Sequence, residues 1–274
     1  MVEHKNCISM RSFCTHKNSV YIVVPLASGK ILLDFLQEKV RLTELETAII
    51  VHSLLQGVSY LHSKNVVHRD LKLENLMFCV PGDIHSLKIL DYGFSKHLQT
   101  GSETLSTICG SPMYVAPEIL KLSSTQSHTP ATYTSAVDAW STGVIIYMLL
   151  AGYAPFGKWN QNEDWQFGSS GLFALSRCTK SLSNEKRVSS DQFPLTLVVI
   201  IFFLMCLDEE DEILLFEKII MGEYSFEDDP WKDISSLAKE LVAGLLVVDP
   251  SRRMTVEQAL NSGFIQIYKN AYRP

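Results

Sequence analysis

The sequence lacks the cysteine pairs and basic clusters that mark several common functions. Its six cysteines are scattered and include no C-x-x-C pair. This argues against a zinc or redox centre and for reduced thiols, so a cytoplasmic location is expected, with the nucleus as the alternative. The formal net charge is −6 at pH 7 and no cluster of lysine and arginine stands out. Nucleic acid is therefore not expected as a partner.

Signals for export and membrane insertion are also missing. The first residues carry charge, and the apolar stretch of a signal peptide does not follow them. The most apolar run, residues 194–207, falls short of the roughly 20 residues that a membrane helix needs. Membrane attachment through this run is thus a minor alternative. A length of 274 residues, 46% hydrophobic and 20% charged, suits a globular protein of one or two domains.

Glycine is absent from residues 1–19, which precede the β-rich run Val20–Val24. A glycine-rich turn beside a strand is a common backbone cradle for nucleotide phosphates. Such a turn is therefore not expected within these residues.

Residues suited to phosphoryl transfer occur further along in a fixed order. Asp70 can orient a hydroxyl group and accept its proton, and Lys72 can neutralise phosphate charge. Asn75 and Asp91 offer the oxygen ligands that magnesium prefers. The spacing predicts phosphoryl-transfer chemistry. The full motifs are His68-Arg69-Asp70-Leu71-Lys72-Leu73-Glu74-Asn75, Asp91-Tyr92-Gly93 and Ala116-Pro117-Glu118.

These motifs resemble those of eukaryotic protein kinases, and the resemblance extends over most of residues 3–157 and 208–274. It implies an α+β, protein-kinase-like fold that is mostly the helical large lobe, with a remnant of the small-lobe sheet. The expected division is a partial kinase domain over 1–274, with 1–24 as the small-lobe remnant, 25–157 and 208–274 as the large lobe, and 158–207 as an insert.

The resemblance also implies a function. Leu71-Lys72 is typical of serine/threonine kinases, and the segments 109–112 and 140–152 resemble the calcium/calmodulin-dependent group. The expected activity is transfer of the γ-phosphoryl group of ATP, with Mg²⁺, to hydroxyl groups of protein substrates.

A catalytically inactive, kinase-like binding or scaffold protein is the alternative function. His4-Lys5-Asn6 resembles the step that follows the glutamate-bearing helix of kinases. The chain is therefore expected to begin after that helix and to have little activity by itself, because positioning of the phosphates supplies most of the catalysis.

The resemblance assigns five residues to the nucleotide and its metal. Val24 is the expected gatekeeper, and Pro25 and Ala27 would meet adenine through a backbone carbonyl and a backbone amide. Pro25 has no N–H, but the carbonyl is the group required at its position. Met77 and Asp91 complete this expected set.

Arg69 is the expected regulatory residue, because a guanidinium beside the catalytic aspartate can grip a phosphate bidentately. Thr107 is the candidate phosphoacceptor in this chain, with Thr104 and Ser106 as rivals.

Two residues are assigned to the groove that holds the substrate peptide. Glu74 fits a preference for a basic residue near the phosphoacceptor. Ser111 would lie near Asp70 and Lys72 and shape the groove.

Other residues are assigned structural roles. Glu118 and Arg253 would form an ion pair that ties the end of the activation segment to the late helices. Asp138 would brace the catalytic loop. Tyr92 differs by one hydroxyl group from the phenylalanine of the usual Asp-Phe-Gly. The remaining structural positions are His68 and Gly93.

Local patterns predict several helices and strands. Thr43-x-x-Glu46 is a capping box that predicts a long helix after it. A helix that opens at Asp138 and runs to residue 150 should end at Gly152. Thr255-x-x-Gln258 predicts another capped helix. The other expected elements are helices over 212–221, 235–248 and 255–261, and strands over 76–78 and 87–90 around a Pro81-Gly82 turn.

The insert, residues 158–207, has no counterpart in the family. The residues at its two ends can be encoded by codons that contain a splice donor and a splice acceptor, and its apolar run 194–207 is what a pyrimidine-rich tract gives when translated. A translated intron is the favoured interpretation, and a genuine surface insertion is the alternative.

Overall fold

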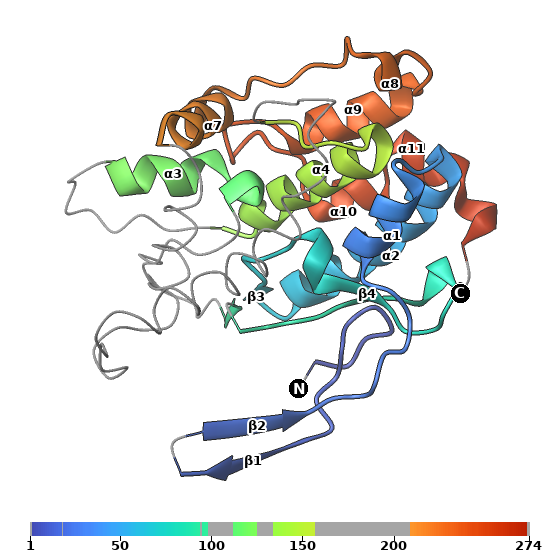
Figure 1. Ribbon diagram of the computed structural model, residues 1–274, viewed down its shortest axis with the longest axis vertical. Coiled ribbons are helices and arrows are strands. Elements are labelled where there is room, and N and C mark those ends of the chain that lie inside the picture. The colour runs from blue at the N-terminus through green and yellow to red at the C-terminus, as the bar shows by residue number, and fades with distance from the viewer. Residues whose placement is uncertain are drawn as a thin grey trace, which may run out of the picture.

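The structure is a computed structural model, and it describes residues 2–17, 19–93, 95–97, 112–124, 134–156 and 209–272. Helices make up most of the described part, and a β-hairpin projects from it (Figure 1). This arrangement of helices and short strands is the α+β, kinase-like fold that the motifs predict.

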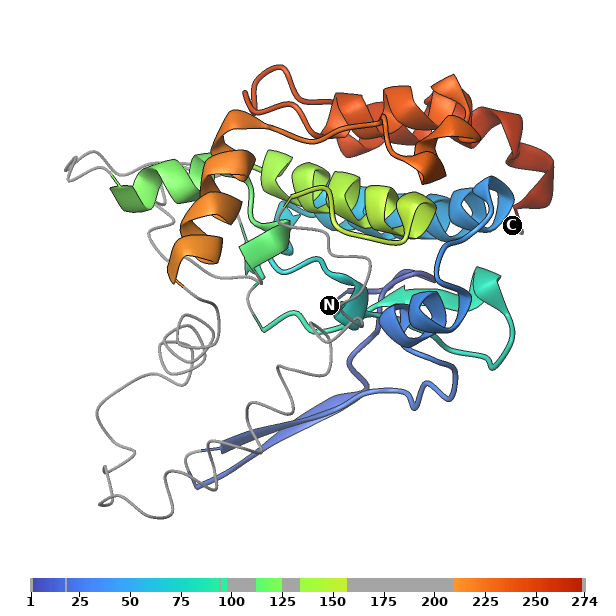
Figure 2. The ribbon, with the colours of Figure 1, turned by 45° about the horizontal axis from the view of Figure 1, so that its top comes forward.

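Helix α4 (Ala136–Ala151) lies at the centre of the helical part, between α2 and the C-terminal helices (Figure 2). All its residues from Val137 to Ala151 are buried, as expected for a helix that is apolar on every side. It ends at Gly152, whose φ of 86° lies in the left-handed region that favours glycine. The predicted helix is thus confirmed, and it begins two residues before Asp138.

Helix α2 (Glu44–Ser63) is held at its start by a capping box. The Thr43 hydroxyl accepts the Glu46 N–H, and the Glu46 carboxylate accepts the Thr43 N–H. The helix packs against α4, against strand β5 (Leu87–Ile89) and against α10 (Val256–Leu260). It therefore joins the middle of the chain to its end.

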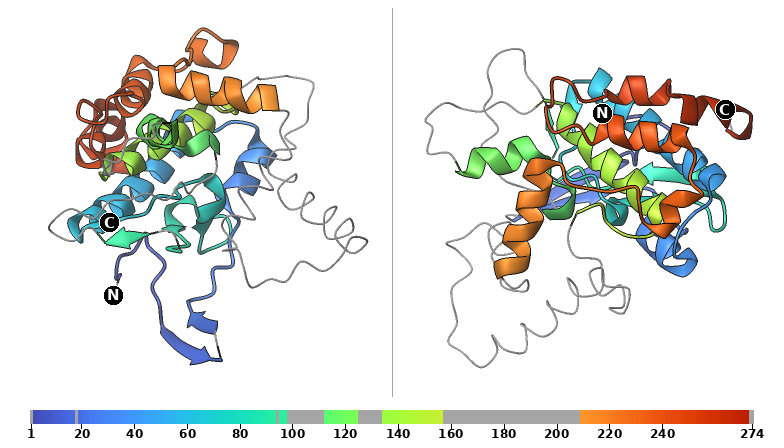
Figure 3. Two further views of the ribbon diagram at one scale, coloured as in Figure 1. Left: turned by 90° about the vertical axis from the view of Figure 1, so that its left-hand side faces the viewer. Right: turned by 90° about the horizontal axis from the view of Figure 1, so that it is seen from above.

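Helix α9 (Ser236–Leu245) covers α4 from the other side, where Gly143 allows a close approach. A Cβ atom at Gly143 would lie 2.9 Å from the Leu245 Cβ atom. Helices α3 (Pro117–Ser124) and α7 (Glu209–Met221) lie side by side at one edge (Figure 3). The other helices are α1 (Leu32–Lys39), α8 (Asp229–Lys232), α11 (Gly263–Ile267) and the 3₁₀ turns η1 (Leu73–Asn75), η2 (Ile84–Ser86), η3 (Pro112–Tyr114) and η4 (Lys269–Ala271).

The described strands form three two-stranded antiparallel sheets. Strand β4 (Leu76–Phe78) pairs with β5 around the predicted turn, in which Gly82 has a φ of 74°. The N-terminal segment joins β5 through a bridge between Cys7 and Ile89. Strands β3 (Val66–Val67) and β6 (Lys96–His97) pair near the catalytic loop, and β1 (Ser12–His16) pairs with β2 (Ser19–Val23).

The β1–β2 hairpin exposes every one of its strand residues. Its second strand was predicted over Val20–Val24 and lies one residue earlier, while β1 was not predicted. All five residues of β1 are exposed, and apolar and polar residues do not alternate along it. Strand β1 therefore lacks the period-2 pattern that predicts a strand. Among the described residues, no helix is both long and apolar enough to span a membrane.

Candidate active site

The catalytic loop runs from His68 to Asn75, between β3 and β4. The Asp70 carboxylate is almost fully buried, and its Oδ2 accepts a hydrogen bond of 2.9 Å from Asn75 Nδ2. The same amide nitrogen donates to the Asp70 carbonyl at 2.8 Å. Lys72 Nζ lies 3.0 Å from Asp70 Oδ2. The structure thus brings together the three residues that the sequence assigned to catalysis.

His68 joins this loop to the segment that carries Asp91. Its Nδ1 accepts the Asp70 N–H at 3.3 Å, so its Nε2 carries the hydrogen and donates to the Leu90 carbonyl at 3.0 Å. The Leu90 N–H in turn donates to the Asn75 carbonyl at 2.8 Å. Asp91 is therefore held next to both Asp70 and Asn75 by a buried imidazole and one backbone bond.

Asp138 braces the loop from the first turn of α4. Its two carboxylate oxygens accept the N–H groups of His68 and Arg69, each at 2.9 Å. Arg69 has a φ of 68°, an uncommon conformation for a residue other than glycine, and these bonds hold it there. Asp138 is completely buried, and it fixes the backbone N–H groups of the strained residue and of the residue before it.

His62, at the end of α2, is a partner of Asp138 that the sequence analysis missed. Its Nε2 lies 2.8 Å from Asp138 Oδ2. Burial alone would raise the pKa of Asp138, but the hydrogen bond and charge of His62, followed by the charge of His68, hold this pKa below its usual value. The only sequence signal for His62 was a basic residue in the last turn of a helix.

Asp91 lies in a sharp, strained turn. Its φ is 52°, and its Oδ1 accepts the Gly93 N–H at 2.9 Å. The ring of Tyr92 packs edge-on against His68, with 5.6 Å between ring centroids and 64° between the planes. The side chain of Asp91 stays exposed and able to meet a ligand.

Asn75 and Asp91 fit a magnesium ion that is shared with phosphates. The Asn75 amide nitrogen is engaged by Asp70, so its oxygen is left as the ligand atom. Magnesium is commonly bound through one or two protein carboxylates, with waters and substrate phosphates completing the octahedron. Among the described residues, no group of three His, Cys, Asp or Glu could hold a metal on its own.

Glu74 is a mostly buried carboxylate beside the catalytic pair. Burial raises its pKa, and the negative charge of Asp70 adds to the rise while Lys72 opposes it. The Tyr114 hydroxyl reaches one side of the carboxylate. Its Oε2 has no hydrogen-bond partner among the described residues. Glu74 can therefore accept a further hydrogen bond at Oε2.

Three of the residues assigned to the nucleotide lie along the connection from β2 to α1, and Met77 lies on β4 beside it. Gly29 packs so tightly on β4 that a Cβ atom there would lie 2.3 Å from the Phe78 carbonyl oxygen. Met77 forms a bridge to Ile31, just before α1. The remaining assigned residues are Val24, Pro25 and Ala27, whose contacts with adenine stay a prediction.

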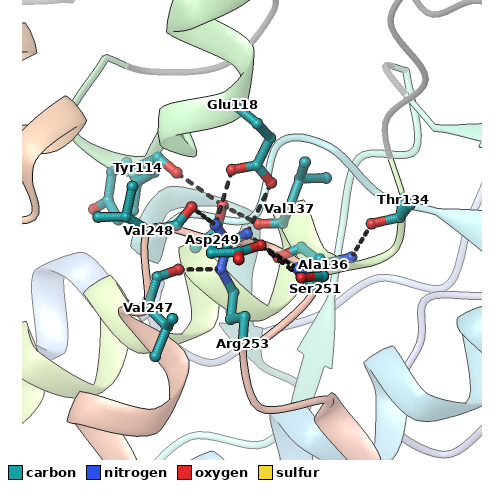
Figure 4. A network of polar contacts seen from close by, with 11 residues as sticks. Tyr114, Glu118, Thr134, Ala136, Val137, Val247, Val248, Asp249, Ser251 and Arg253 are labelled. Carbon is teal, nitrogen blue, oxygen red and sulfur yellow. Dashed lines mark hydrogen bonds and ion pairs between the residues drawn. The ribbon is translucent and has the colours of Figure 1, made fainter.

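The predicted ion pair between Glu118 and Arg253 is present and bidentate (Figure 4). Both nitrogen–oxygen distances are 2.8 Å. The buried guanidinium also donates to the carbonyls of Ala136 at 2.8 Å and Val247 at 2.8 Å, and it lies 5.1 Å from the ring centroid of Trp140. One side chain thus joins α3, the start of α4 and the turn after α9.

Several predicted positions lie outside the described residues. They are Thr104, Ser106, Thr107, Ser111 and the whole insert 158–207. Arg69 is described, but the phosphoacceptor proposed for it is not. Control by phosphorylation and the shape of the groove at Ser111 therefore stay predictions.

A cavity of ≈ 200 Å³ opens on another part of the molecule. It lies between the N-terminal segment, α2 and η2, with Tyr272 at its edge. None of the residues assigned to catalysis lines it. Its lining is Lys5, Asn6, Ile49, His52, Ser53, Gln56, Asp83, His85 and Tyr272.

Known proteins resemble this chain over nearly its whole length. A family model for the protein kinase domain matches residues 1–265. The human phosphorylase b kinase gamma catalytic chain, liver/testis isoform, is 35% identical over 263 residues, which cover 96% of this chain and 51% of the human one. A probable myosin light chain kinase of Dictyostelium discoideum is 33% identical over 274 residues, which cover 100% of this chain and 69% of that one.

The chain therefore spans about half the length of the human relative. Its motifs, its fold and these matches agree, and they show that the chain belongs to the protein kinase family, with the predicted resemblance to serine/threonine kinases of the calcium/calmodulin-dependent group confirmed.

Proposed function

We propose that this chain transfers the γ-phosphoryl group of ATP, with Mg²⁺, to serine or threonine hydroxyl groups of protein substrates. The observation that carries the proposal is the buried hydrogen-bond chain from Asp70 through His68 to Leu90, which sets the proton acceptor and the metal ligand Asp91 side by side. Asn75 completes the arrangement through its bonds to Asp70.

The residues divide the reaction between them. Asp70 orients the substrate hydroxyl and accepts its proton as the oxygen attacks phosphorus. Lys72, 3.0 Å from Asp70, places a positive charge where negative charge develops on the transferred group. Asn75 and Asp91 would hold magnesium, which would supply further neutralisation of phosphate charge. Most of the catalysis is positioning and electrostatics, and the rigid hydrogen bonds around Asp70 serve both.

The preferred substrate carries a basic residue near its phosphoacceptor. Glu74 supports this preference because its pKa is raised and its Oε2 has no partner among the described residues. A lysine or arginine of the substrate would supply a second positive charge, beside that of Lys72, and a hydrogen-bond donor for Oε2.

The test compares two aspartate variants in an assay with Mg-ATP and a basic peptide. Asp70→Asn should lower turnover by about 10²-fold or more while nucleotide affinity stays nearly unchanged, because Asp70 meets the hydroxyl and not the nucleotide. Asp91→Asn should weaken both, because it removes a metal ligand. Asp229→Asn, at an exposed carboxylate on α8, is the matched control and should change neither.

The alternative, a kinase-like scaffold, predicts other outcomes. If the unaltered chain neither binds Mg-ATP nor transfers phosphate, the catalytic proposal fails for this chain. Substantial turnover by Asp70→Asn would overturn the role assigned to Asp70.

A further inference from the structure

The hydroxyl group of Tyr92 makes contacts that a phenylalanine could not make. It donates to the Ile89 carbonyl oxygen at 3.2 Å. It also lies against the thiol of Cys7, and the two side chains interact. Tyr92 immediately follows the proposed metal ligand Asp91, so these contacts bear directly on the orientation of that ligand.

Cys7 belongs to the N-terminal segment, which is firmly attached to β5. The Cys7 side chain is completely buried, and its Sγ lies 3.7 Å from the Gly57 carbonyl oxygen. The Ile89 carbonyl oxygen accepts the Ile8 N–H at 2.9 Å, and the Ile89 N–H donates to the Asn6 carbonyl at 2.9 Å. The Ile89 carbonyl oxygen thus accepts hydrogen bonds from both the N-terminal segment and the Tyr92 hydroxyl.

The turn at Asp91 needs support on both sides. A φ of 52° is costly for an aspartate and persists only where neighbouring bonds fix it. Before Asp91, His68 holds the Leu90 carbonyl at 3.0 Å. After it, the Gly93 N–H binds the Asp91 side chain within the turn itself. Of the contacts described for the turn, the Tyr92 hydroxyl alone reaches the N-terminal segment.

We propose that the Tyr92 hydroxyl and the Cys7 thiol form a latch that keeps Asp91 in its metal-binding orientation by tying the turn to residues 6–8. Tyr92 is a positioning residue in this arrangement, because it acts through Asp91. The latch makes the placement of the N-terminal segment and the affinity for magnesium interdependent. It rests on the proposed function, since the metal it serves is the magnesium of that reaction.

The test measures binding of ATP at a series of Mg²⁺ concentrations for Tyr92→Phe, Cys7→Ala and Cys7→Ser. Tyr92→Phe should raise the Mg²⁺ concentration at half-saturation about three- to tenfold, which corresponds to about 0.7–1.4 kcal/mol at 1.4 kcal/mol per tenfold. Cys7→Ala should act in the same direction, and Cys7→Ser, which keeps a polar hydrogen, should restore most of the affinity. Binding of ATP without Mg²⁺ should be unchanged in all three.

Tyr60→Phe is the matched control. The Tyr60 hydroxyl accepts the Glu3 N–H at 3.0 Å, so it contacts the same N-terminal segment but not the turn. A second measurement follows alkylation of Cys7 by mass spectrometry, with the exposed Cys14 as internal standard. Tyr92→Phe should speed alkylation of Cys7 relative to Cys14 several-fold, and Tyr60→Phe should not.

The outcomes separate the latch from the proposed function. If Tyr92→Phe binds Mg-ATP with unchanged dependence on Mg²⁺, the latch is overturned while the kinase function stands. If Tyr60→Phe shifts that dependence as much as Tyr92→Phe does, the effect is general loosening and the latch is also overturned. Absence of Mg-ATP binding by the unaltered chain would overturn the proposed function and the metal-positioning role together.

Discussion

At the scale of single residues, we expect Glu74 to favour binding of a basic peptide and to lower the melting temperature. Burial raises its pKa, which means that the folded structure disfavours the ionised form of this carboxylate. Glu74→Gln should therefore raise the melting temperature. The same change should raise KM for a basic peptide about tenfold or more, because it removes a charge-assisted contact.

Thermal unfolding and peptide kinetics check the Glu74 prediction. Glu257→Gln, at an exposed glutamate of α10, is the control and should leave both quantities unchanged. A lower melting temperature for Glu74→Gln, or an equal KM for basic and neutral peptides in the unaltered chain, would contradict the assignment.

Two histidines make the free energy of unfolding depend on pH. Burial lowers the pKa of His4 and of His52, and the charge of Lys5 adds to both effects. Because the folded pKa values lie below the unfolded value of 6.5, the unfolded chain binds more protons below that pH. Their contribution to stability is present above about pH 6.5 and is lost as the pH falls.

Urea unfolding at about pH 7.5 and pH 5.5 measures this dependence. The double variant His4→Gln/His52→Gln should lose less stability between the two values than the unaltered chain. His16→Gln, at an exposed histidine on the β1–β2 hairpin, serves as the control for mutation itself. Equal losses in the double variant and the unaltered chain would show that these histidines do not carry the effect.

The sequence predicted which residues form the site better than it predicted what holds them. Asp70, Asn75 and Asp91 stand in a recognisable motif, and their proximity follows from it. Two other contacts do not follow from any motif. They are the contact between His62 and Asp138, which lie 76 residues apart in the chain, and the bond from Tyr92 to Ile89. Such contacts depend on how helices and strands pack, and neither periodicity nor spacing encodes that.

At the scale of elements, the Arg253 cluster ties α3 and α4 to the turn after α9. Arg253→Met would leave the Glu118 carboxylate without its partner in a largely buried place, and it should cost about 3–5 kcal/mol of the free energy of unfolding. The double variant Arg253→Met/Glu118→Leu should cost clearly less, because no unpaired charge remains.

Denaturant titration measures both variants. Lys232→Met breaks an exposed ion pair with Asp229 and should cost far less, because solvent screens that pair. If Arg253→Met cost as little as Lys232→Met, the pair would have no greater role than a surface contact.

Elements with strong local signals were predicted correctly, and those without them were not. The capping boxes at Thr43 and Thr255 marked the starts of α2 and α10. Strands β3 and β6 have two residues each, too few for any periodic pattern. Strand β3 leads into the catalytic loop and β6 follows the turn at Asp91, so their pairing depends on how those two segments meet.

At the scale of the whole molecule, the predicted insert 158–207 is the main departure that we expect from the family. The described residues on both sides of it pack into the helical part, since Phe156 is buried against Trp140 and α7, which begins at Glu209, contacts α3. Deleting the insert and restoring one aspartate between Phe156 and Glu209 should raise soluble yield, because an apolar run of this kind promotes aggregation.

Yield and melting temperature of the shortened chain decide between the two interpretations of the insert. Equal or lower values after deletion would show that the insert is a folded part of the protein. Sequencing of transcripts across the junction answers the same question independently.

The kinase fold was predictable as a whole because one motif set carried it, and the family matches confirm that prediction. What the sequence did not show was the exposed state of the β1–β2 hairpin, where apolar side chains such as Phe13, Val20 and Ile22 have no cover among the described residues. Burial of such a hairpin depends on neighbours and not on its own pattern.

The Glu118–Arg253 pair also orders events during synthesis. Its partners are 135 residues apart, so at about 5–20 residues per second Glu118 leaves the ribosome about 7–27 s before Arg253. Throughout that interval the nascent chain holds the catalytic loop without the arginine that fixes α3 and α4. We expect the unfinished chain to be bound by chaperones, and release should await the last helices.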